Sequence, residues 1–486
     1  MLAVELLPVM GWAFGSKGMR NQLVWFRNDL RINDNPALFY ASESGEPTIA
    51  VYVATPQQWQ LHDDAHSKID FWRRNLHCLY DSLAELNITL HFFQVSTYQQ
   101  VPDLITSVCE QWNISQLHFN QQYAVNEQER DQHVVDVCSQ IDVQTHSYNE
   151  QLLLTPKSVR TKVGEPFKVF TPFARQARQQ MQEPLVMLPA PKRQNSIKVT
   201  RLREELELQD VSWVSVGKAV QDMWPAGEES AEVKLIHFYE NNIQSYEQNR
   251  DSPSVSGTSQ LSPYLASGVI SIKQCWHATT HYCGRSDSVI VWQNELLWRE
   301  FYNHILIDYP QISKHKPWKI KTDTIQWRDN ETELRAWQLG QTGFPIIDAA
   351  MRQLLSCGWM HNRLRMITAM FLSKHLMIDW RLGERWFMKH LIDGDLAANN
   401  GGWQWCASTG TDAVPYFRLF NPVRQSERFD PEGKFIRHYL PELSALSNKE
   451  IHFPIKNRPE EYPMPIIDLA DGRKRVLAEF KALGTK

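Results

Sequence analysis

The sequence contains no run of 18 apolar residues, no CxxC pair among its seven cysteines and no large net charge. The first absence argues against a transmembrane helix. The second argues against a disulfide framework, so we expect reduced thiols, no metal site and a cytoplasmic protein without membrane partners. Because the formal net charge is only −4, binding to nucleic acid would require a local basic patch.

Tryptophan, in contrast, is abundant. Eleven of the 18 tryptophans lie between Trp276 and Trp405. A tryptophan-rich core would explain this cluster, but each buried indole N–H needs a partner, so the clustering also favours a stacking or electron-transfer role. At 486 residues the chain exceeds the usual size of one hydrophobic core, and we expect two domains.

Short apolar runs alternate with helical patterns in the first third of the chain. Residues 22–26, 48–53, 88–93, 116–120 and 143–148 predict strands, and residues 71–86 and 97–112 predict helices between them. This alternation indicates an α/β domain at 21–150, built on an open parallel sheet with helices on both faces. Residues 1–20 are expected to be a disordered extension.

The remainder of the chain changes character twice. Residues 151–230 are rich in proline and basic side chains, which predicts a long connection over the surface. From 231 to 480, apolar residues recur at three- and four-residue spacing, for example at 288–306 and 345–378, which predicts an all-α domain. The chain stops soon after its last helix-like segment, at 472–483.

Three segments carry chemically informative residues. The segment at 391–418, LIDGDLAANNGGWQWCASTGTDAVPYFR, combines carboxylates, paired amides and two indoles, which suggests an aromatic-walled pocket for a flat heterocycle. GTSQLS (257–262) places hydroxyl residues at a helix start, where N–H groups can face a phosphate, although Ser and Thr are also ordinary N-caps. In 292–302, a Trp, a Glu, an Arg and a Tyr share one helical face; an amphipathic edge with an ion pair would also explain that pattern.

Together with LVWFRNDLRINDNPAL (23–38), NELLWREFY (294–302) and GWMHNRLRM (358–366), these segments resemble the signatures of the photolyase/cryptochrome family. The resemblance extends from about residue 22 to 475 and is to bacterial class I cyclobutane pyrimidine dimer (CPD) photolyases with a folate antenna. It implies an α/β antenna-binding domain and a helical FAD- and DNA-binding domain. The implied activity is light-driven repair, by electron transfer from excited reduced FAD to a flipped-out dimer in ultraviolet-damaged DNA.

The resemblance also implies site residues. Those expected to bind FAD are Tyr246, Thr258, Ser259, Leu261, Ser262, Trp292, Arg299, Asn362, Arg365, Asp393, Asp395 and Asn399. Arg365 would pair with Asp393. Asn399 would lie beside flavin N5, where plant cryptochromes carry an aspartate and animal ones a cysteine. Trp403, Trp380 and Trp327 would form an electron-transfer chain, although any three tryptophans could be core residues.

For the substrate, the resemblance implies that Glu295 hydrogen-bonds the dimer, between the indoles of Trp298 and Trp405. The expected DNA contacts are Arg250, Glu295, Trp298, Arg299, Arg363, Met366, Trp405 and Arg418. Related (6-4) photolyases carry histidines at the positions of Asn362 and Met366, so CPDs are the expected substrate. The neighbouring His361 is expected to be structural.

His62, Asn126, Glu127 and Lys314 match a folate-binding site, so methenyltetrahydrofolate is the expected antenna; a deazaflavin remains an alternative. A monomer is expected. The main rival function is a cryptochrome-type blue-light photoreceptor, against which Asn399, the Trp298/Trp405 pair and the short C-terminal end argue. A second rival, a nucleotide-binding protein without photochemistry, would purify colourless.

Overall fold

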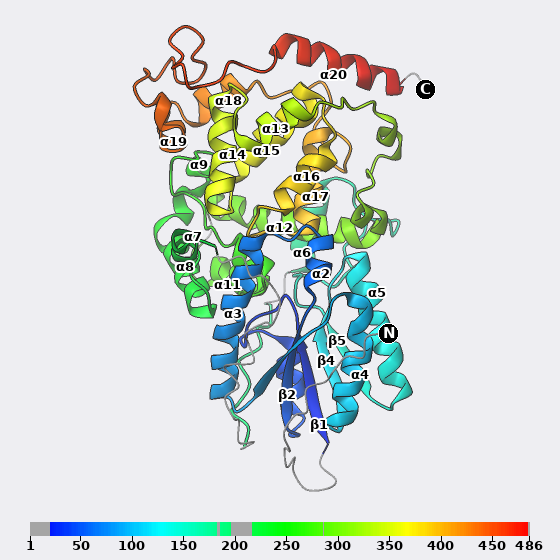
Figure 1. Cartoon of the computed structure of the whole chain (residues 1–486). Helices are drawn as coiled ribbons and strands as arrows, with labels where there is room; N and C mark the ends of the chain where they lie inside the picture. The colour runs from blue at the N-terminus through cyan, green and yellow to red at the C-terminus, as the bar shows by residue number, and fades with distance from the viewer. Residues whose placement is uncertain (1–19, 182–184, 196–215, 285, 485–486) are drawn as a thin grey trace.

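The computed structural model describes residues 20–181, 185–195, 216–284 and 286–484. The expected extension at 1–20 therefore lies almost wholly outside the described residues. Figure 1 shows a parallel sheet flanked by helices in the N-terminal part and only helices in the C-terminal part. Within the described chain, no helix is both long enough and apolar enough to span a bilayer.

The N-terminal part is built on five strands: β1 (Asn21–Phe26), β2 (Thr48–Ala54), β3 (Thr89–Gln94), β4 (Ile114–Asn120) and β5 (Gln144–Tyr148). All neighbouring strands pair in parallel, in the order β3-β2-β1-β4-β5. The predicted open parallel sheet is confirmed, and each predicted strand lies within two residues of its observed bounds. The order reverses direction at β1, and ligands of such sheets bind beside that reversal, beyond the carboxyl ends of the strands.

Alternating side chains of the strands feed two different cores. Val24 and Phe26 of β1 pack with helices α1 (Pro36–Glu43) and α3 (His66–Glu85). Leu23 and Trp25 pack on the opposite face with α4 (Val101–Gln111) and α5 (Val125–Gln140). The helices therefore cover both faces, as predicted. The first core continues without a break into the helical part of the molecule.

The connection at 151–230 is partly helical. Helix α6 (Phe170–Gln180) packs against α12 (Asp287–Asp308) of the helical part, and α7 (Lys218–Met223) packs against α14 (Pro345–Cys357). Residues 182–184 and 196–215 of the predicted surface connection lie outside the described residues. The described part of the connection thus includes a helix that forms one wall of the helical domain.

The helical part is assembled from many short helices (Figure 1). Beyond those already given, they are α8 (Glu228–Asn241), α9 (Tyr246–Asn249), α10 (Ser262–Ala266), α11 (Ile272–His281), α13 (Glu331–Leu339), α15 (Asn362–Met370), α16 (Trp380–Met388), α17 (Leu396–Ala407), α18 (Pro422–Phe429), α19 (Lys434–Tyr439) and α20 (Leu469–Gly484). The helical stretch predicted at 345–378 is interrupted: Gly358, at φ +69°, ends α14 in a left-handed conformation, and His361 caps the next helix. A π-helical turn, η5 (Phe371–Leu376), follows α15.

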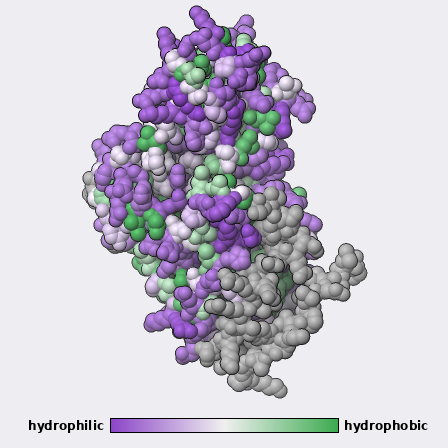
Figure 2. All heavy atoms as spheres, turned by 60° about the vertical axis from the view of Figure 1, so that its left-hand side comes forward, coloured by the Kyte–Doolittle hydropathy of each residue, from purple (hydrophilic) through white to green (hydrophobic). Residues whose placement is uncertain are grey.

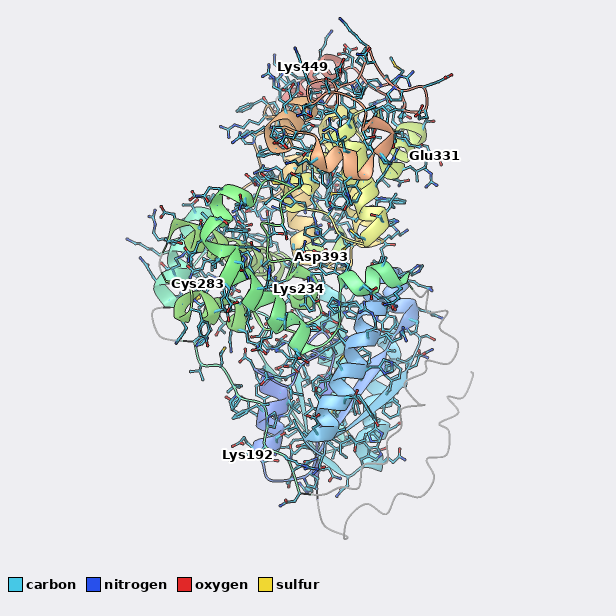
Figure 3. All side chains as sticks on the ribbon, turned by 90° about the vertical axis from the view of Figure 1, so that its left-hand side faces the viewer. Lys192, Lys234, Cys283, Glu331, Asp393 and Lys449 are labelled. Atoms are coloured by element: carbon cyan, nitrogen blue, oxygen red, sulfur yellow. The ribbon has the colours of Figure 1, made fainter. Side chains whose placement is uncertain are left out.

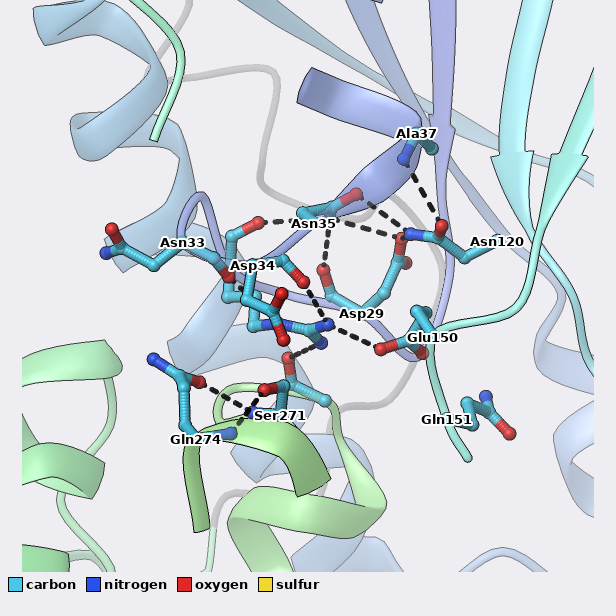
Figure 4. A network of polar contacts seen from close by, with 12 residues as sticks. Asp29, Asn33, Asp34, Asn35, Ala37, Asn120, Glu150, Gln151, Ser271 and Gln274 are labelled. Carbon is cyan, nitrogen blue, oxygen red and sulfur yellow. Dashed lines mark hydrogen bonds and ion pairs between the residues drawn. The ribbon is translucent and has the colours of Figure 1, made fainter. Parts of the chain in front are cut away.

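A buried polar network joins the two parts (Figure 4). The guanidinium group of Arg31, fully buried, donates to the carbonyl oxygen of Gly268 at 2.9 Å and to the Glu150 carboxylate at 2.5 Å. Gly268 has φ +64°, and an added Cβ would collide with the backbone of Asn28. Because a buried charge needs close partners, this contact fixes the loop after β1 against the helical part.

Candidate functional site

A cavity of about 250 Å³ opens at the carboxyl end of the sheet, between the two parts of the molecule. Its sheet side includes His62, Asn126 and Glu127, to which the family resemblance gives an antenna-binding role. Its helical side includes Arg299 and Asp395, which the sequence assigns to FAD. The cavity therefore brings together residues predicted for two different chromophores, at the place where ligands of doubly wound sheets bind.

The antenna candidates form a hydrogen-bonded group on the sheet side. Nδ2 of Asn126 lies 2.9 Å from Nε2 of His62, and Nδ1 of His62 lies 3.5 Å from the Glu127 carboxylate. Tyr98 donates to the same carboxylate at 3.1 Å. Burial and the adjacent Glu127 raise the pKa of Tyr98 well above its ordinary value, so this phenol stays protonated. Lys314, in contrast, is exposed and lies outside the cavity lining, although its neighbour His315 belongs to it.

The predicted ion pair between Arg365 and Asp393 is present. Nη2 of Arg365 donates to both carboxylate oxygens of Asp393, at 3.0 and 2.8 Å, and Nε donates to the carbonyl of Met360 at 2.8 Å. Figure 3 shows Asp393 near the middle of the molecule, beneath the helices of the C-terminal part. A buried carboxylate held in this way is strongly oriented.

Helix α17 carries the next candidates. Asp395 is its N-cap and accepts from the backbone N–H of Ala398 at 2.8 Å. One turn later, Nδ2 of Asn399 donates to the carbonyl oxygen of Glu384 at 3.0 Å. In the described chain, Oδ1 of Asn399 has no hydrogen-bond partner and remains available as an acceptor. Gly401 allows Tyr302 of α12 to lie directly on the backbone of α17, because an added Cβ would overlap the Tyr302 ring.

The GTSQLS loop runs into helix α10. Gln260 adopts a left-handed conformation with φ +51°, and Leu261 is buried. The side-chain hydroxyls of Thr258 and Ser259 form no hydrogen bond within the described part of the chain, whereas Ser262 accepts from the indole N–H of Trp359 at 3.3 Å. Two partly buried hydroxyls without protein partners fit an anionic group such as a diphosphate.

Two other FAD candidates lie deeper. Tyr246 and Trp292 are both buried and pack against Phe238, with ring centroids 5.7 and 5.1 Å apart respectively. Asn362, at the start of α15, is exposed. The FAD candidates therefore come from several elements of the helical part rather than from one motif.

The aromatic wall differs from its sequence-based description. Phe170 of α6 stacks face to face on Trp298, with ring centroids 3.8 Å apart and an interplanar angle of 7°. Tyr302 contacts the same indole at 5.5 Å. Among the described residues, no ring contact joins Trp298 to Trp405. One face of the Trp298 indole is thus covered by a residue of the connection. A flat ligand would have to stack on the remaining surface of this indole.

The candidate electron-transfer residues are mostly buried. Trp403 is 2% exposed and Trp380 is 1% exposed, while Trp327 is half-buried. The indole of Trp403 lies against Gly383 of α16, one turn from Trp380; any Cβ at this glycine would overlap the ring. Within the described residues, the indole N–H groups of Trp403 and Trp327 have no partner. Four other tryptophans of the described chain also have an indole N–H without a partner, so this feature does not distinguish the candidates from core tryptophans.

Two arginines predicted to contact DNA are paired with carboxylates. Arg250 lies 2.8 Å from Glu295, and Arg363 lies 2.7 Å from Asp251 while its guanidinium covers the Phe429 ring at 4.6 Å. Burial raises the pKa of Glu295, and Arg250 opposes that shift. Arg418 is exposed, and Met366 is partly buried beside Arg363.

His361 caps a helix, which agrees with its expected structural role. Nδ1 accepts from the backbone N–H of Arg363 at 3.2 Å, so the side chain caps α15. Desolvation lowers its pKa from 6.5 to about 4. The folded state thus favours the neutral form, and this contribution to stability is complete above pH 6.5 and is lost as the pH falls towards 4.

We therefore expect His361→Asn, which keeps a capping side chain, to flatten the acid dependence of stability. From the size of the pKa shift, lowering the pH from 7 to 4 should decrease the unfolding free energy of wild type by about 3 kcal/mol more than that of the variant. Urea denaturation at four pH values measures it. Parallel curves for the two proteins would contradict a neutral His361.

The sequence missed three residues that the structure brings to this site: Phe170, His315 and Glu384. Phe170 follows a proline-rich stretch and carried no visible signal. Glu384 stands in the charged run RLGERW, which resembles a solvated helix face, yet its side chain is fully buried. A buried charge is recognisable only once its packing partners are known.

Comparisons with known proteins identify the family of the chain. Residues 22–192 match the family model "DNA photolyase", and residues 292–482 match "FAD binding domain of DNA photolyase". The chain is 42% identical over 477 residues to the deoxyribodipyrimidine photo-lyase of Escherichia coli (strain K12), covering 96% of this chain and 99% of that protein.

Solved structures give the same result. A bacterial class III photolyase from Agrobacterium tumefaciens superposes with a TM-score of 0.83 at 36% identity, covering 98% of this chain and all of that one. The Synechocystis sp. PCC6803 cryptochrome also reaches 0.83, but at 26% identity, over 95% of this chain and 99% of that one. Similar to these proteins along almost its whole length, with both domains matched, the chain belongs to the DNA photolyase family within the photolyases and cryptochromes.

Proposed function

We propose that this protein is a deoxyribodipyrimidine photo-lyase that repairs CPDs in DNA with the energy of light. One observation carries the proposal beyond family membership. Asp395, Asn399 and Trp403 are spaced by four residues along α17, so a carboxylate, a free amide oxygen and a buried indole share one helical face. The cryptochrome alternative is not favoured, because the relatives with high identity and coverage are named photo-lyases.

The residues of the site fit FAD. Thr258 and Ser259 would bind its diphosphate with hydroxyls that have no protein partner in the described chain, and Arg365–Asp393 would face the flavin. The cofactor, when bound and reduced, supplies light absorption and the transferable electron. Asn399 would accept a hydrogen bond from flavin N5 through Oδ1, because its Nδ2 is already committed to Glu384. Arg299 lines the cavity, and this supports a cofactor role more than a DNA role.

The substrate side would receive a dimer turned out of the helix. Flipping a damaged base pair costs only a few kcal/mol, and stacking on an indole can recover it. Trp298, fixed by Phe170, would offer its free surface to the dimer. Glu295 would accept a hydrogen bond from a thymine N3–H as a carboxylate, or donate one to a thymine carbonyl when protonated. Burial raises the pKa of Glu295, which favours the donating form, whereas the adjacent Arg250 lowers this pKa and favours the carboxylate.

The sheet side of the cavity would hold the antenna. His62, Asn126 and Glu127 present polar atoms beside Tyr98, which suits the polar heterocycle of a folate. Methenyltetrahydrofolate is the ligand we propose, and the absorption spectrum of the purified protein would distinguish it from a deazaflavin. We expect a monomer that acts in the cytoplasm.

The proposal is tested with purified, reduced protein and ultraviolet-irradiated oligo-thymidine. Recovery of thymine absorbance in blue light, with none in the dark, is the expected result. An absence of recovery by protein that carries reduced FAD would contradict CPD repair and direct attention to sensing or to another lesion.

The salt dependence of DNA affinity tests whether Arg363 contacts DNA phosphate. We expect Arg363→Gln to reduce the slope of log K against log salt concentration by about 0.9, the value for one lost phosphate contact. The double variant Arg363→Gln/Asp251→Asn should have the same salt slope as Arg363→Gln, because both lack the guanidinium group. In the double variant, moreover, no unpaired carboxylate remains to repel the DNA. Lys449→Gln is the matched control, since Lys449 is exposed and lies at the opposite end of the helical part from Asp393 in Figure 3. An unchanged slope in both Arg363 variants would remove this residue from the interface.

A further inference from the structure

His315 connects the cavity to the buried centre of the helical part. Its side chain is 43% exposed and lines the cavity, while Nδ1 lies 2.9 Å from the carboxylate of Glu384, which is 0% exposed. The backbone of His315 is in the left-handed conformation with φ +55°, and Arg381 donates to its carbonyl at 2.8 Å. Both the ring and the backbone of His315 are thus attached to α16.

Glu384 in turn holds the two amides of α17. Its carboxylate accepts from Nδ2 of Asn400 at 2.7 Å, and its backbone carbonyl accepts from Nδ2 of Asn399 at 3.0 Å. Oδ1 of Asn400 in turn accepts a hydrogen bond from Nε2 of Gln404 at 2.7 Å. The imidazole of His315 is therefore connected through Glu384, by two hydrogen bonds, to Asn399, the amide that the proposed function places beside the flavin.

We propose that His315 and Glu384 form a charge-balancing pair that connects the antenna cavity to the flavin site and sets how readily bound FAD is reduced. The proposal rests on the proposed function for the presence of FAD beside Asn399. His315 would be a positioning residue, since it acts through Glu384 and does not itself touch the flavin.

The charges explain the direction of the effect. A fully buried carboxylate is strongly destabilised unless a positive charge faces it. Among the residues that the structure describes, His315 is the ionisable group within hydrogen-bond distance of Glu384. Reduction adds negative charge to the flavin. If His315 lost its charge, the remaining carboxylate would repel that added charge across a medium of low dielectric constant. Bound FAD would then be harder to reduce.

Other charges around His315 are already partly paired. Arg381 and Arg385 face it from α16, and Asp63 faces it from the sheet side, where it pairs with Arg385 at 2.9 Å and with Lys389 at 3.3 Å. Lys314 and Lys316 flank it along the chain and are exposed. The hydrogen bond that His315 donates to the Glu384 carboxylate raises the pKa of His315, which favours the charged imidazolium.

The test compares the reduction potential of bound FAD in wild type, His315→Gln, Glu384→Gln and the double variant, by spectroelectrochemical titration from pH 6 to 9. At pH 7, His315→Gln should lower the equilibrium constant for reduction about tenfold, which is 59 mV for one electron. The double variant should return close to wild type, because it contains neither charge. As pH rises through the pKa of His315, the wild-type potential should fall relative to that of the double variant.

Either of two results would overturn the proposal: a His315→Gln potential equal to wild type, or a double variant that shifts as far as His315→Gln. Glu384→Gln keeps an acceptor for Asn400 and the backbone carbonyl that holds Asn399, so its folding and FAD content serve as the check on structure. Failure of the proposed function is distinguishable, because it would appear as wild-type protein without bound FAD or without light-dependent repair. A wild type that repairs dimers while His315→Gln retains its potential would remove only this inference.

Discussion

Trp403→Phe is expected to slow the photoreduction of oxidised FAD at least about tenfold, equivalent to some 1.4 kcal/mol in the barrier. The indole is buried, lies against α16 one turn from Trp380, and has no hydrogen-bond partner in the described chain. Phenylalanine fills much of the volume but is far harder to oxidise. Repair by chemically reduced protein should be unchanged, because that reaction needs no electron from the protein interior.

Two companion variants sharpen this test. Gly383→Ala keeps every tryptophan but forces the Trp403 ring off its contact with α16, so it too should slow photoreduction. Trp276→Phe makes the same substitution at a buried indole of α11 that belongs to another core, and it should have no effect. Blue-light illumination with a reductant in solution, followed at the flavin absorption bands, measures all three. Normal photoreduction in Trp403→Phe would exclude the proposed chain.

Glu295→Ala should lower both the affinity for dimer-containing DNA and the repair yield, with FAD still bound. A hydrogen bond to a charged group contributes about 1.5–3 kcal/mol, so the loss of affinity should be about tenfold or more. The same change frees Arg250, now 2.8 Å from Glu295, to bind phosphate. Binding to undamaged DNA should therefore stay constant or strengthen, and the ratio of the two affinities is the sensitive quantity.

Glu295→Gln separates the two effects. Glutamine can still donate a hydrogen bond to a thymine carbonyl but does not neutralise Arg250. The glutamine variant should therefore bind undamaged DNA as tightly as the alanine variant does, and it should keep more repair activity. Fluorescence anisotropy with matched damaged and undamaged oligonucleotides gives the affinities, and thymine recovery per absorbed photon gives the yield. Equal repair by wild type and Glu295→Ala would remove this carboxylate from the mechanism.

The local features of the fold were predictable because they depend on neighbouring residues. Short apolar runs between helical segments located the five strands, and Asp395, Asn399 and Trp403 share one helical face because they are four residues apart. The pairing of Arg365 with Asp393 came from the family resemblance, and the structure contains it. Gly358 shows the limit of periodicity, since a single left-handed residue divided one expected helical stretch.

The sequence by itself determined the family, the parallel sheet and most candidates for the cofactor, because strand and helix periodicity and short motifs are properties of contiguous residues. Only the tertiary structure decided that Phe170 covers one face of Trp298, that Arg250 and Arg363 are paired with carboxylates, and that Glu384 is buried against His315. The physical reason is common to all of them. Periodicity tells which face of an element is buried. It does not tell which distant segment packs against that face, and this segment, which supplies the partner of each charge, is determined only by the fold of the whole chain.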